Sequence, residues 1–184
     1  MIINIRGTSG SGKSHLVREI MQRYDCKLAV KHEGRKRPIG YLCKRAGQRD
    51  LAVLGHYETP CGGCDTIPSM ETIFALVRQS HYAGADVLFE GLIVNSDRNR
   101  TIRMHEDDLP LKIITLSTSI DLCLESIGER RKSKGNAKPL NPRNTEAKFK
   151  LALTNHQRFL DAGLDTHLLT RDEAWCLIIE LLEL

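Results

Sequence analysis

The chain has 184 residues, of which 41% are hydrophobic, 27% charged and 5% aromatic, with 14 glycines and 6 prolines. These proportions are typical of one ordinary globular domain, and they exclude a disordered, collagen-like or low-complexity chain. No apolar run approaches the ~18 residues that a membrane span requires, so we expect a cytoplasmic protein that does not enter a membrane. We interpret its six cysteines as reduced thiols, because a chain of this length can bury a core without disulfides.

The net charge of +4 conceals two strongly basic windows. Residues 27–50 and residues 128–150 each contain eight Lys or Arg and two acidic residues, so each window has a net charge of +6, whereas the rest of the chain has −8. Such runs are most often solvated surface. Anion binding is the alternative, and the motifs described below favour it.

Strands and helices alternate along most of the chain. Residues 2–5 form an apolar run that leads into a glycine-rich loop, and the apolar spacing of residues 16–21 indicates a helix after it. The other expected elements are a helix at 69–82, a strand at 87–89, a strand at 113–116, a helix at 119–132, a helix at 145–162, a strand at 166–169 and a helix that contains Trp175 and Leu182. This alternation predicts an α/β domain over residues 1–184, with a parallel central sheet covered on both faces.

Two segments interrupt the alternation. Within residues 27–56, three short apolar runs separated by turns predict an inserted β meander, which carries the first basic window. Residues 128–143 contain two prolines and two glycines without an apolar period. We expect a mobile basic lid there, which carries much of the second window.

The glycine-rich loop gives the strongest functional signal. It reads GTSGSGKS and matches the phosphate-binding pattern GxxxxGK[ST] at every fixed position. Glycines permit positive φ and bring backbone N–H groups close to a phosphate, and the lysine spans the β- and γ-phosphates. We therefore predict that the loop binds ATP, that Lys13 is catalytic and that Ser14 ligates Mg²⁺. The predicted ATP-binding residues are Gly7, Thr8, Ser9, Gly10, Ser11, Gly12, Lys13 and Ser14.

Glu90 directly follows the apolar run 87–89. A carboxylate at the end of a neighbouring strand could hold Mg²⁺ through water or take a proton from the acceptor. A phosphate acceptor needs no general base, whereas a hydroxyl acceptor benefits from one, so Glu90 favours a hydroxyl. The alternative is a solvated carboxylate at a strand end.

Arginines near these motifs are candidates for stabilising the transferred phosphoryl group. Arg130 and Arg131 lie at the end of an expected helix, at the start of the predicted lid, where they could neutralise charge and exclude water. Arg98, followed by Arg100 and Arg103, could face the acceptor or its phosphates. Solvated helix arginines are the alternative for each of them.

Cys61 and Cys64 are spaced like half of a zinc site. The residues that could complete such a site are Cys26, His32, Cys43 and His56. No second CxxC pair is present, and a redox pair would be expected where a strand leads into a helix. We favour an acceptor-binding loop, in which Gly62, Gly63 and Asp65 approach the acceptor closely.

Together, the phosphate-binding loop, Phe89-Glu90-Gly91, Ser96-Asp97-Arg98 and Gly128-Glu129-Arg130-Arg131 resemble a P-loop nucleoside or nucleotide kinase of the thymidylate kinase type. Residues 55–67 and 138–142 are similar to a bacteriophage group, the 5-hydroxymethyluracil DNA kinases. The resemblance implies a three-layer P-loop NTPase fold as a single kinase domain. It also implies ATP-dependent phosphorylation of a base hydroxymethyl group in DNA, a step toward hypermodified thymidine, in the cytoplasm of a host cell.

The basic meander departs from ordinary thymidylate kinases, which have a short helical acceptor region there. A free mononucleotide needs only one or two arginines, whereas DNA presents a track of phosphates to Lys and Arg. A base in DNA must also be flipped out or met as single strand. We therefore predict that modified DNA is the acceptor. The predicted acceptor-binding residues are Arg35, Lys36, Arg37, Gly62, Gly63, Asp65 and Arg98.

Three alternatives remain at this stage. The first is a kinase of free deoxynucleoside monophosphates or nucleosides. The second is a P-loop ATPase or GTPase with a nucleic-acid partner, although no base-specificity motif or arginine finger is evident. The third is a nucleic-acid-binding module with a decayed nucleotide site, against which the intact Lys13 and Ser14 count.

Overall fold

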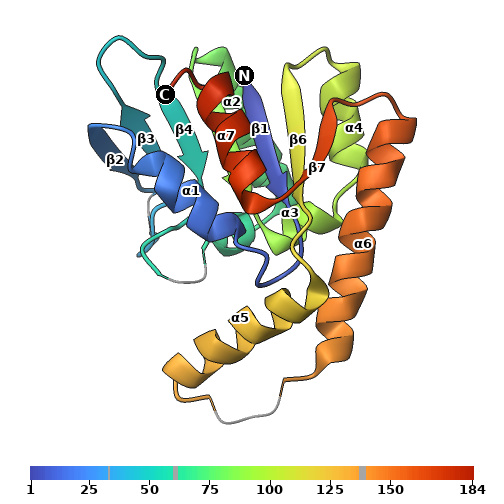
Figure 1. The fold of residues 1–184 in the computed structure, drawn as a ribbon. Coiled ribbons are helices and arrows are strands. Elements are labelled where there is room, and N and C mark those ends of the chain that lie inside the picture. Colours follow the sequence, from blue (N-terminus) through green and yellow to red (C-terminus); the bar gives the residue numbers. More distant parts are fainter. Residues whose placement is uncertain (33, 60–61, 137–139) are drawn as a thin grey trace.

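The computed structural model describes residues 1–32, 34–59, 62–136 and 140–184 (Figure 1). In these ranges, seven strands form one sheet in the order β2-β3-β4-β5-β1-β6-β7. The strands are β1 (Ile2–Arg6), β2 (Cys26–Val30), β3 (Gly40–Lys44), β4 (Leu51–Leu54), β5 (Asp86–Glu90), β6 (Leu111–Leu116) and β7 (Thr166–Leu169). The helices are α1 (Lys13–Met21), the single 3-10 turn η1 (Cys64–Thr66), α2 (Met70–Tyr82), α3 (Leu92–Ser96), α4 (Asn99–Glu106), α5 (Ile120–Ser133), α6 (Pro142–Asp161) and α7 (Arg171–Leu181).

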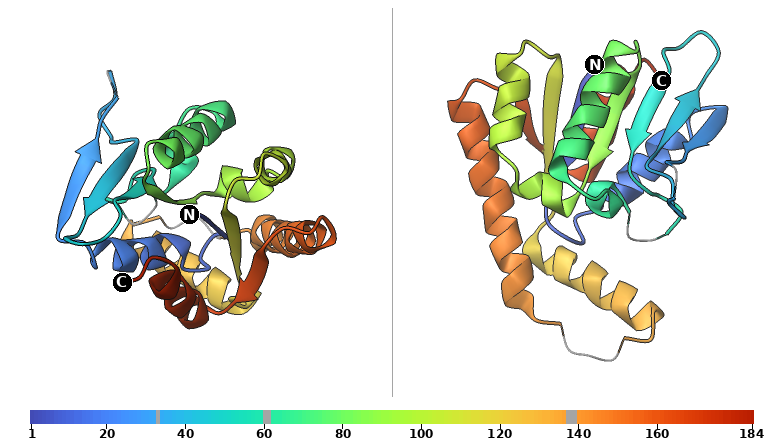
Figure 2. Two further views of the ribbon diagram at one scale, coloured as in Figure 1. Left: turned by 90° about the horizontal axis from the view of Figure 1, so that it is seen from above. Right: turned by 180° about the vertical axis from the view of Figure 1, so that it is seen from behind.

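Strands β4, β5, β1, β6 and β7 are parallel, and helices cover both faces of this part of the sheet (Figure 2). Alternate side chains of β1 explain the layering, because neighbours on a strand point to opposite faces. Ile3 and Ile5 pack in the core that α1 and α7 cover. Ile2 packs in the opposite core, with Phe74 of α2 and Phe159 of α6. The predicted three-layer α/β fold is confirmed.

The predicted meander is also confirmed, and it belongs to the main sheet. Strands β2, β3 and β4 pair antiparallel, and β4 then pairs parallel with β5, with Leu54 opposite Phe89. The meander therefore extends the central sheet at one edge. All five residues of β2 are exposed, because β2 is the edge strand of the sheet.

The segment predicted as a lid over residues 128–143 is helical at both ends, so that boundary was wrong. Helix α5 continues to Ser133 and α6 begins at Pro142, which leaves 134–141 as the connection; residues 137–139 lie outside the described residues. The apolar period is missing because α5 projects away from the sheet (Figure 1) and buries only Cys123 and Ile127. Arg, Lys and Glu are good helix formers without such a period. The mobility of the segment stays a prediction.

Two short helices follow β5 that the sequence analysis did not predict. Helix α3 has five residues and α4 has eight, of which Thr101 and Met104 are buried. Segments this short carry too few apolar positions to reveal a helical period. None of the helices in the described part of the chain combines the length and the apolar character that a membrane crossing requires.

Candidate active site

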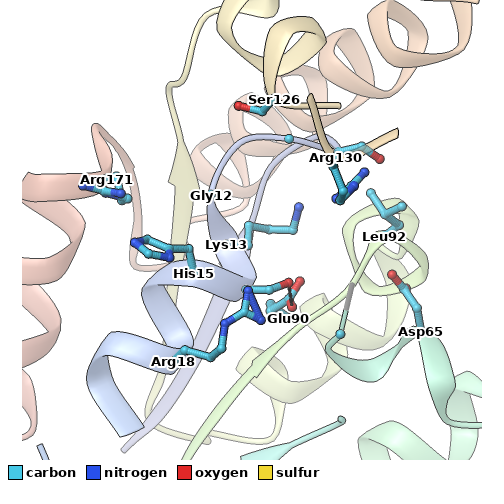
Figure 3. A pocket seen from close by; sticks show the side chains of 14 residues that line it. Gly12, Lys13, His15, Arg18, Asp65, Glu90, Leu92, Ser126, Arg130 and Arg171 are labelled. Atoms are coloured by element: carbon cyan, nitrogen blue, oxygen red, sulfur yellow. Dashed lines mark hydrogen bonds between the residues drawn. The ribbon is translucent and has the colours of Figure 1, made fainter. Parts of the chain in front are cut away.

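A cleft of about 470 Å³ opens at the carboxyl ends of the parallel strands (Figure 3). Its lining residues come from the glycine-rich loop and α1, from the segment around η1, from β5 and α3, and from α5 and α7. They are Ser9, Gly10, Gly12, Lys13, Ser14, His15, Arg18, Gly62, Asp65, Glu90, Leu92, Ser126, Arg130 and Arg171. The loop and Glu90, predicted from separate parts of the sequence, therefore meet in one cleft.

The glycine-rich loop is held in a fixed conformation. Gly7, Gly10 and Gly12 have φ values of 140°, 81° and 94°, which side chains on L-residues rarely permit. A Cβ at Gly10 would lie 2.3 Å from the carbonyl oxygen of Cys123 in α5. The Thr8 hydroxyl donates to the carbonyl of Thr145 in α6 at 3.2 Å. The loop is thus packed against both α5 and α6.

Lys13 lies inside the curve of this loop. Its Nζ donates to the carbonyl oxygens of Gly7 and Thr8, each at 2.8 Å, and the side chain is buried. Burial lowers the pKa of Lys13, and the charge of Glu90 partly opposes that shift. An ammonium group held this way has lost most of its water, so a phosphate placed at the loop would gain a strong partner.

Glu90 faces the loop from the end of β5. Its Oε1 accepts a hydrogen bond from the Ser14 hydroxyl at 2.7 Å, and the residue is only 2% exposed. Burial raises the pKa of Glu90, and Lys13 opposes the shift. Gly63 packs directly on this carboxylate, since a Cβ there would lie 2.4 Å from Oε1.

Asp65 lies on the opposite side of the cleft, in η1 (Figure 3). Its Oδ1 accepts from the backbone N–H of Ile93 in α3 at 3.0 Å. Asp65 also lines a second hollow of about 420 Å³, whose other described lining residues are Arg35, Lys36, Arg37 and Thr66. Arg35 donates to the carbonyl of Thr66. Asp65 therefore stands between the loop cleft and a strongly basic surface.

The predicted arginines divide between the cleft and the surface. Arg130 lines the cleft. Arg131 instead donates to Asn136 Oδ1 at 3.5 Å, and Arg98 is exposed at the start of α4, with its Nε 3.4 Å from Asn99 Oδ1. The structure does not bring Arg98 or Arg131 to the described cleft lining.

Two arginines that line the cleft, Arg18 and Arg171, were not predicted from the sequence. Arg18 lies four residues after Ser14, one helical turn further along α1, so the spacing could have revealed it. Arg171 begins α7 directly after β7, whose carboxyl end reaches the same edge of the sheet. That position becomes visible only once the strand order is known.

The cysteine pair gives no support to a zinc site. Cys61 lies outside the described residues, and Cys64 is buried with its Sγ 3.6 Å from the carbonyl oxygen of Leu54. In the described ranges no three His, Cys, Asp or Glu side chains gather as metal ligands. The five described cysteines are free thiols.

Arg6, a buried residue at the end of β1, hydrogen-bonds to the segment that follows Glu90. The guanidinium of Arg6 donates to Asn4 Oδ1 at 2.6 Å, to the carbonyl of Asp97 at 2.7 Å and to Thr101 Oγ1 at 2.7 Å. It also lies 4.6 Å from the centre of the Phe159 ring. Burial lowers the pKa of Arg6 to about 9, against the charge of Asp97. The last residue of β1 is thereby fixed to the segment that follows Glu90.

We expect the Arg6→Ala substitution to lower the free energy of unfolding by about 3 kcal/mol or more, because it strands several buried acceptors. Denaturant unfolding measures the change. Arg103→Ala, on the exposed surface of α4, is the matched control and should change it by at most about 0.5 kcal/mol. Equal effects of the two substitutions would contradict the bracing role.

The chain is 45% identical over 183 residues to the 5-hmdU DNA kinase of Pseudomonas phage PaMx11, covering 99% of this chain and 97% of that protein. The chain belongs to the 5-hmdU DNA kinase family. The 5-hmdU DNA kinase of Delftia phage PhiW-14 is 31% identical over 182 residues, covering 90% of this chain and 66% of its own length. The kinase resemblance drawn from the motifs is confirmed.

A solved structure supports the fold of this kinase independently. Deoxyadenosine kinase from M. mycoides superposes with a TM-score of 0.51 at 14% identity, covering 100% of this chain and 99% of the other. No family model matches the chain. As a member of the 5-hmdU DNA kinase family, the protein is a phosphotransferase with an α/β kinase fold.

Proposed function

We propose that this kinase transfers the γ-phosphoryl group of ATP to the hydroxymethyl group of 5-hydroxymethyluracil in DNA. The observation that carries the proposal is the junction at Asp65, where a phosphate-binding cleft opens next to a hollow lined by three consecutive basic residues. Membership of the 5-hmdU DNA kinase family supports the same acceptor.

The cleft residues fit a nucleoside triphosphate with Mg²⁺. Mg²⁺ prefers oxygen ligands and keeps several waters, so one or two protein oxygens plus phosphates suffice. Ser14 and Glu90, already joined at 2.7 Å, supply a hydroxyl and a carboxylate of the right kind. When bound, the ion would neutralise charge on the β- and γ-phosphates. Lys13 would hold the same phosphates from the loop side.

Arg130 is suited to the transferred group. It reaches the cleft from α5, opposite the loop, and is partly buried there. Phosphoryl transfer spreads negative charge over three equatorial oxygens, and a fixed cation near them lowers the barrier. We assign Arg130 to that charge, with Lys13 on the other side.

The basic hollow favours a polynucleotide over a free nucleotide. Lys36 and Arg37 are exposed in the connection between β2 and β3, and Arg35 is tied to the carbonyl of Thr66 beside Asp65. These charges lie outside the phosphate-binding cleft, so ATP does not use them. A DNA strand that places its base at the cleft would have neighbouring phosphates within their reach.

The test of the acceptor is a parallel assay. Labelled γ-phosphate from ATP is offered with DNA containing 5-hydroxymethyluracil, with unmodified DNA and with thymidine monophosphate. We expect label in the modified DNA alone. Labelling of thymidine monophosphate without modified DNA at low salt would show that the acceptor is a free nucleotide.

A triple variant in which alanine replaces Arg35, Lys36 and Arg37 should bind DNA more weakly. Its affinity for DNA should also depend less steeply on salt. Each duplex phosphate contact contributes a slope of about −0.9 in log affinity against log salt, so losing two or three contacts flattens the slope by about 2 to 3. ATP affinity should stay within about twofold. Fluorescence anisotropy of labelled DNA at several salt concentrations measures the slope.

The control triple substitution removes Arg23, Arg45 and Arg49, which do not line either hollow in the described chain. It makes the same change in net charge. An equal flattening by both triple variants would mean that only net charge matters, which contradicts a DNA site at the hollow.

A further inference from the structure

The cleft brings together two carboxylates, and their surroundings differ. Glu90 lies beside α1, and Asp65 lies across the gap on η1 (Figure 3). On the basis of the proposed function, we infer that Asp65 is the catalytic residue that accepts the proton of the acceptor hydroxyl, while Glu90 serves the metal side.

The contacts of Glu90 direct it toward the nucleotide. Its Oε1 is occupied by the hydroxyl of Ser14 at 2.7 Å, and Ser14 is the residue whose oxygen suits Mg²⁺. The backbone of Gly63 covers the same oxygen. The residue is 2% exposed, so an acceptor that approaches from the basic hollow meets Glu90 only after passing Asp65.

The contacts of Asp65 leave one oxygen available. Oδ1 accepts from the N–H of Ile93 at 3.0 Å, and within the described residues no hydrogen bond reaches Oδ2. The residue is exposed and lines both the cleft and the basic hollow. An acceptor whose neighbouring phosphates lie over Arg35 and Lys36 would therefore bring its hydroxyl past this carboxylate toward the γ-phosphate.

The backbone makes room for this carboxylate. A Cβ at Gly91 would lie 3.0 Å from Asp65 Oδ1 and 3.3 Å from the Cβ of Cys64. A side chain at position 91 would require Asp65 or η1 to shift by a few tenths of an ångström. Gly91 directly follows Glu90 and also packs against Asp65, so the backbone at residues 90–91 contributes to the position of both carboxylates.

Phosphoryl transfer to the acceptor forms one bond to phosphorus and breaks one. The hydroxymethyl oxygen forms a bond to the γ-phosphorus, and the bond from that phosphorus to the β,γ-bridging oxygen breaks, with its electron pair leaving on ADP. The hydroxyl proton passes to the free oxygen of Asp65. A positioned base of this kind contributes about 100- to 10,000-fold to the rate.

Asp65→Asn is the direct test, because the amide oxygen can still accept from Ile93 while the basicity is lost. In single-turnover reactions with DNA containing 5-hydroxymethyluracil, we expect the rate of transfer to fall about 100-fold or more. The affinities for Mg-ATP and DNA and the thermal midpoint should stay close to wild type. Glu58→Gln, an exposed carboxylate near the same segment that does not line the cleft, is the matched control and should keep the rate within about twofold.

A transfer rate above half of wild type in Asp65→Asn would overturn the inference, as would a loss in Glu58→Gln as large as that in Asp65→Asn. If Asp65→Asn lowers the thermal midpoint, Asp65→Glu decides. Partial recovery of the rate by this carboxylate supports the inference, and a rate no higher than that of Asp65→Asn overturns it.

The wild-type acceptor assay keeps this test separate from the proposed function. Wild-type enzyme that labels a free nucleotide and not modified DNA refutes the proposed acceptor. If that nucleotide is phosphorylated on a hydroxyl, the rate in Asp65→Asn still supports or overturns the role of Asp65. If it is phosphorylated on its phosphate, which needs no general base, the role of Asp65 is overturned as well.

Discussion

Lys13→Ala is expected to abolish phosphoryl transfer, with a fall in rate of about 100-fold or more. The ammonium group lies inside the glycine-rich loop, 2.8 Å from the carbonyls of Gly7 and Thr8, where it would neutralise the β- and γ-phosphates as charge develops. Alanine leaves those carbonyls in place but removes the only cation that the described loop points inward. Single-turnover transfer from labelled ATP measures the effect.

The fold should survive this substitution. Burial disfavours the charge of Lys13, and relief of that cost offsets the two hydrogen bonds that the substitution removes, so the thermal midpoint should stay close to that of wild type. Lys112→Ala, at the start of β6 and away from the cleft, is the control for transfer and should retain the rate. More than half of the wild-type rate in Lys13→Ala, with normal unfolding, would falsify the assignment of the loop.

Glu90→Gln is expected to act through Mg²⁺. Glutamine keeps an oxygen that can accept from the Ser14 hydroxyl but removes the negative charge next to it. Substitutions of this kind beside a metal ligand typically cost about 10- to 100-fold in metal affinity or activity. We therefore expect the activity at limiting Mg²⁺ to fall by that factor, and to recover in part as Mg²⁺ is raised. A titration of rate against Mg²⁺ at saturating ATP measures both changes.

The control for this titration is Glu180→Gln, an exposed position on α7. Its Mg²⁺ dependence should match that of wild type. If Glu90→Gln loses activity equally at all Mg²⁺ concentrations, Glu90 acts on the acceptor instead, and the division of roles with Asp65 is wrong.

The features that were predicted best from the sequence are those that a short segment determines by itself. The glycine-rich loop is local, because its glycines, lysine and serine are fixed by spacing and by the strand and helix on either side. Glu90 was found because the end of a parallel strand lies at the same edge as the loop. The meander was visible as three short apolar runs separated by turns, although its continuity with β5 was not.

Features that depend on tertiary packing were not predictable in the same way. The charge of Arg6 gives no hint that it is buried at the end of β1, since arginine is usually exposed. Arg98, Arg130 and Arg131 are all arginines close in sequence to predicted kinase motifs. Of these three, only Arg130 lines the described cleft. Which side of a helix meets the cleft is decided by packing, and α5 buries too few residues to display that side in its sequence.

The pairing of β4 with β5 has a mechanical consequence. Leu54, the last residue of β4, pairs with Phe89, the residue before Glu90, so the meander and the strand that carries Glu90 belong to one continuous sheet. Helix α5, which carries Arg130, projects from that sheet (Figure 1) and is joined to it by residues 117–119 after β6, with contacts to the glycine-rich loop and to α6. A shift of the meander would therefore be transmitted through β4 to Glu90, whereas Arg130 belongs to a helix outside the sheet.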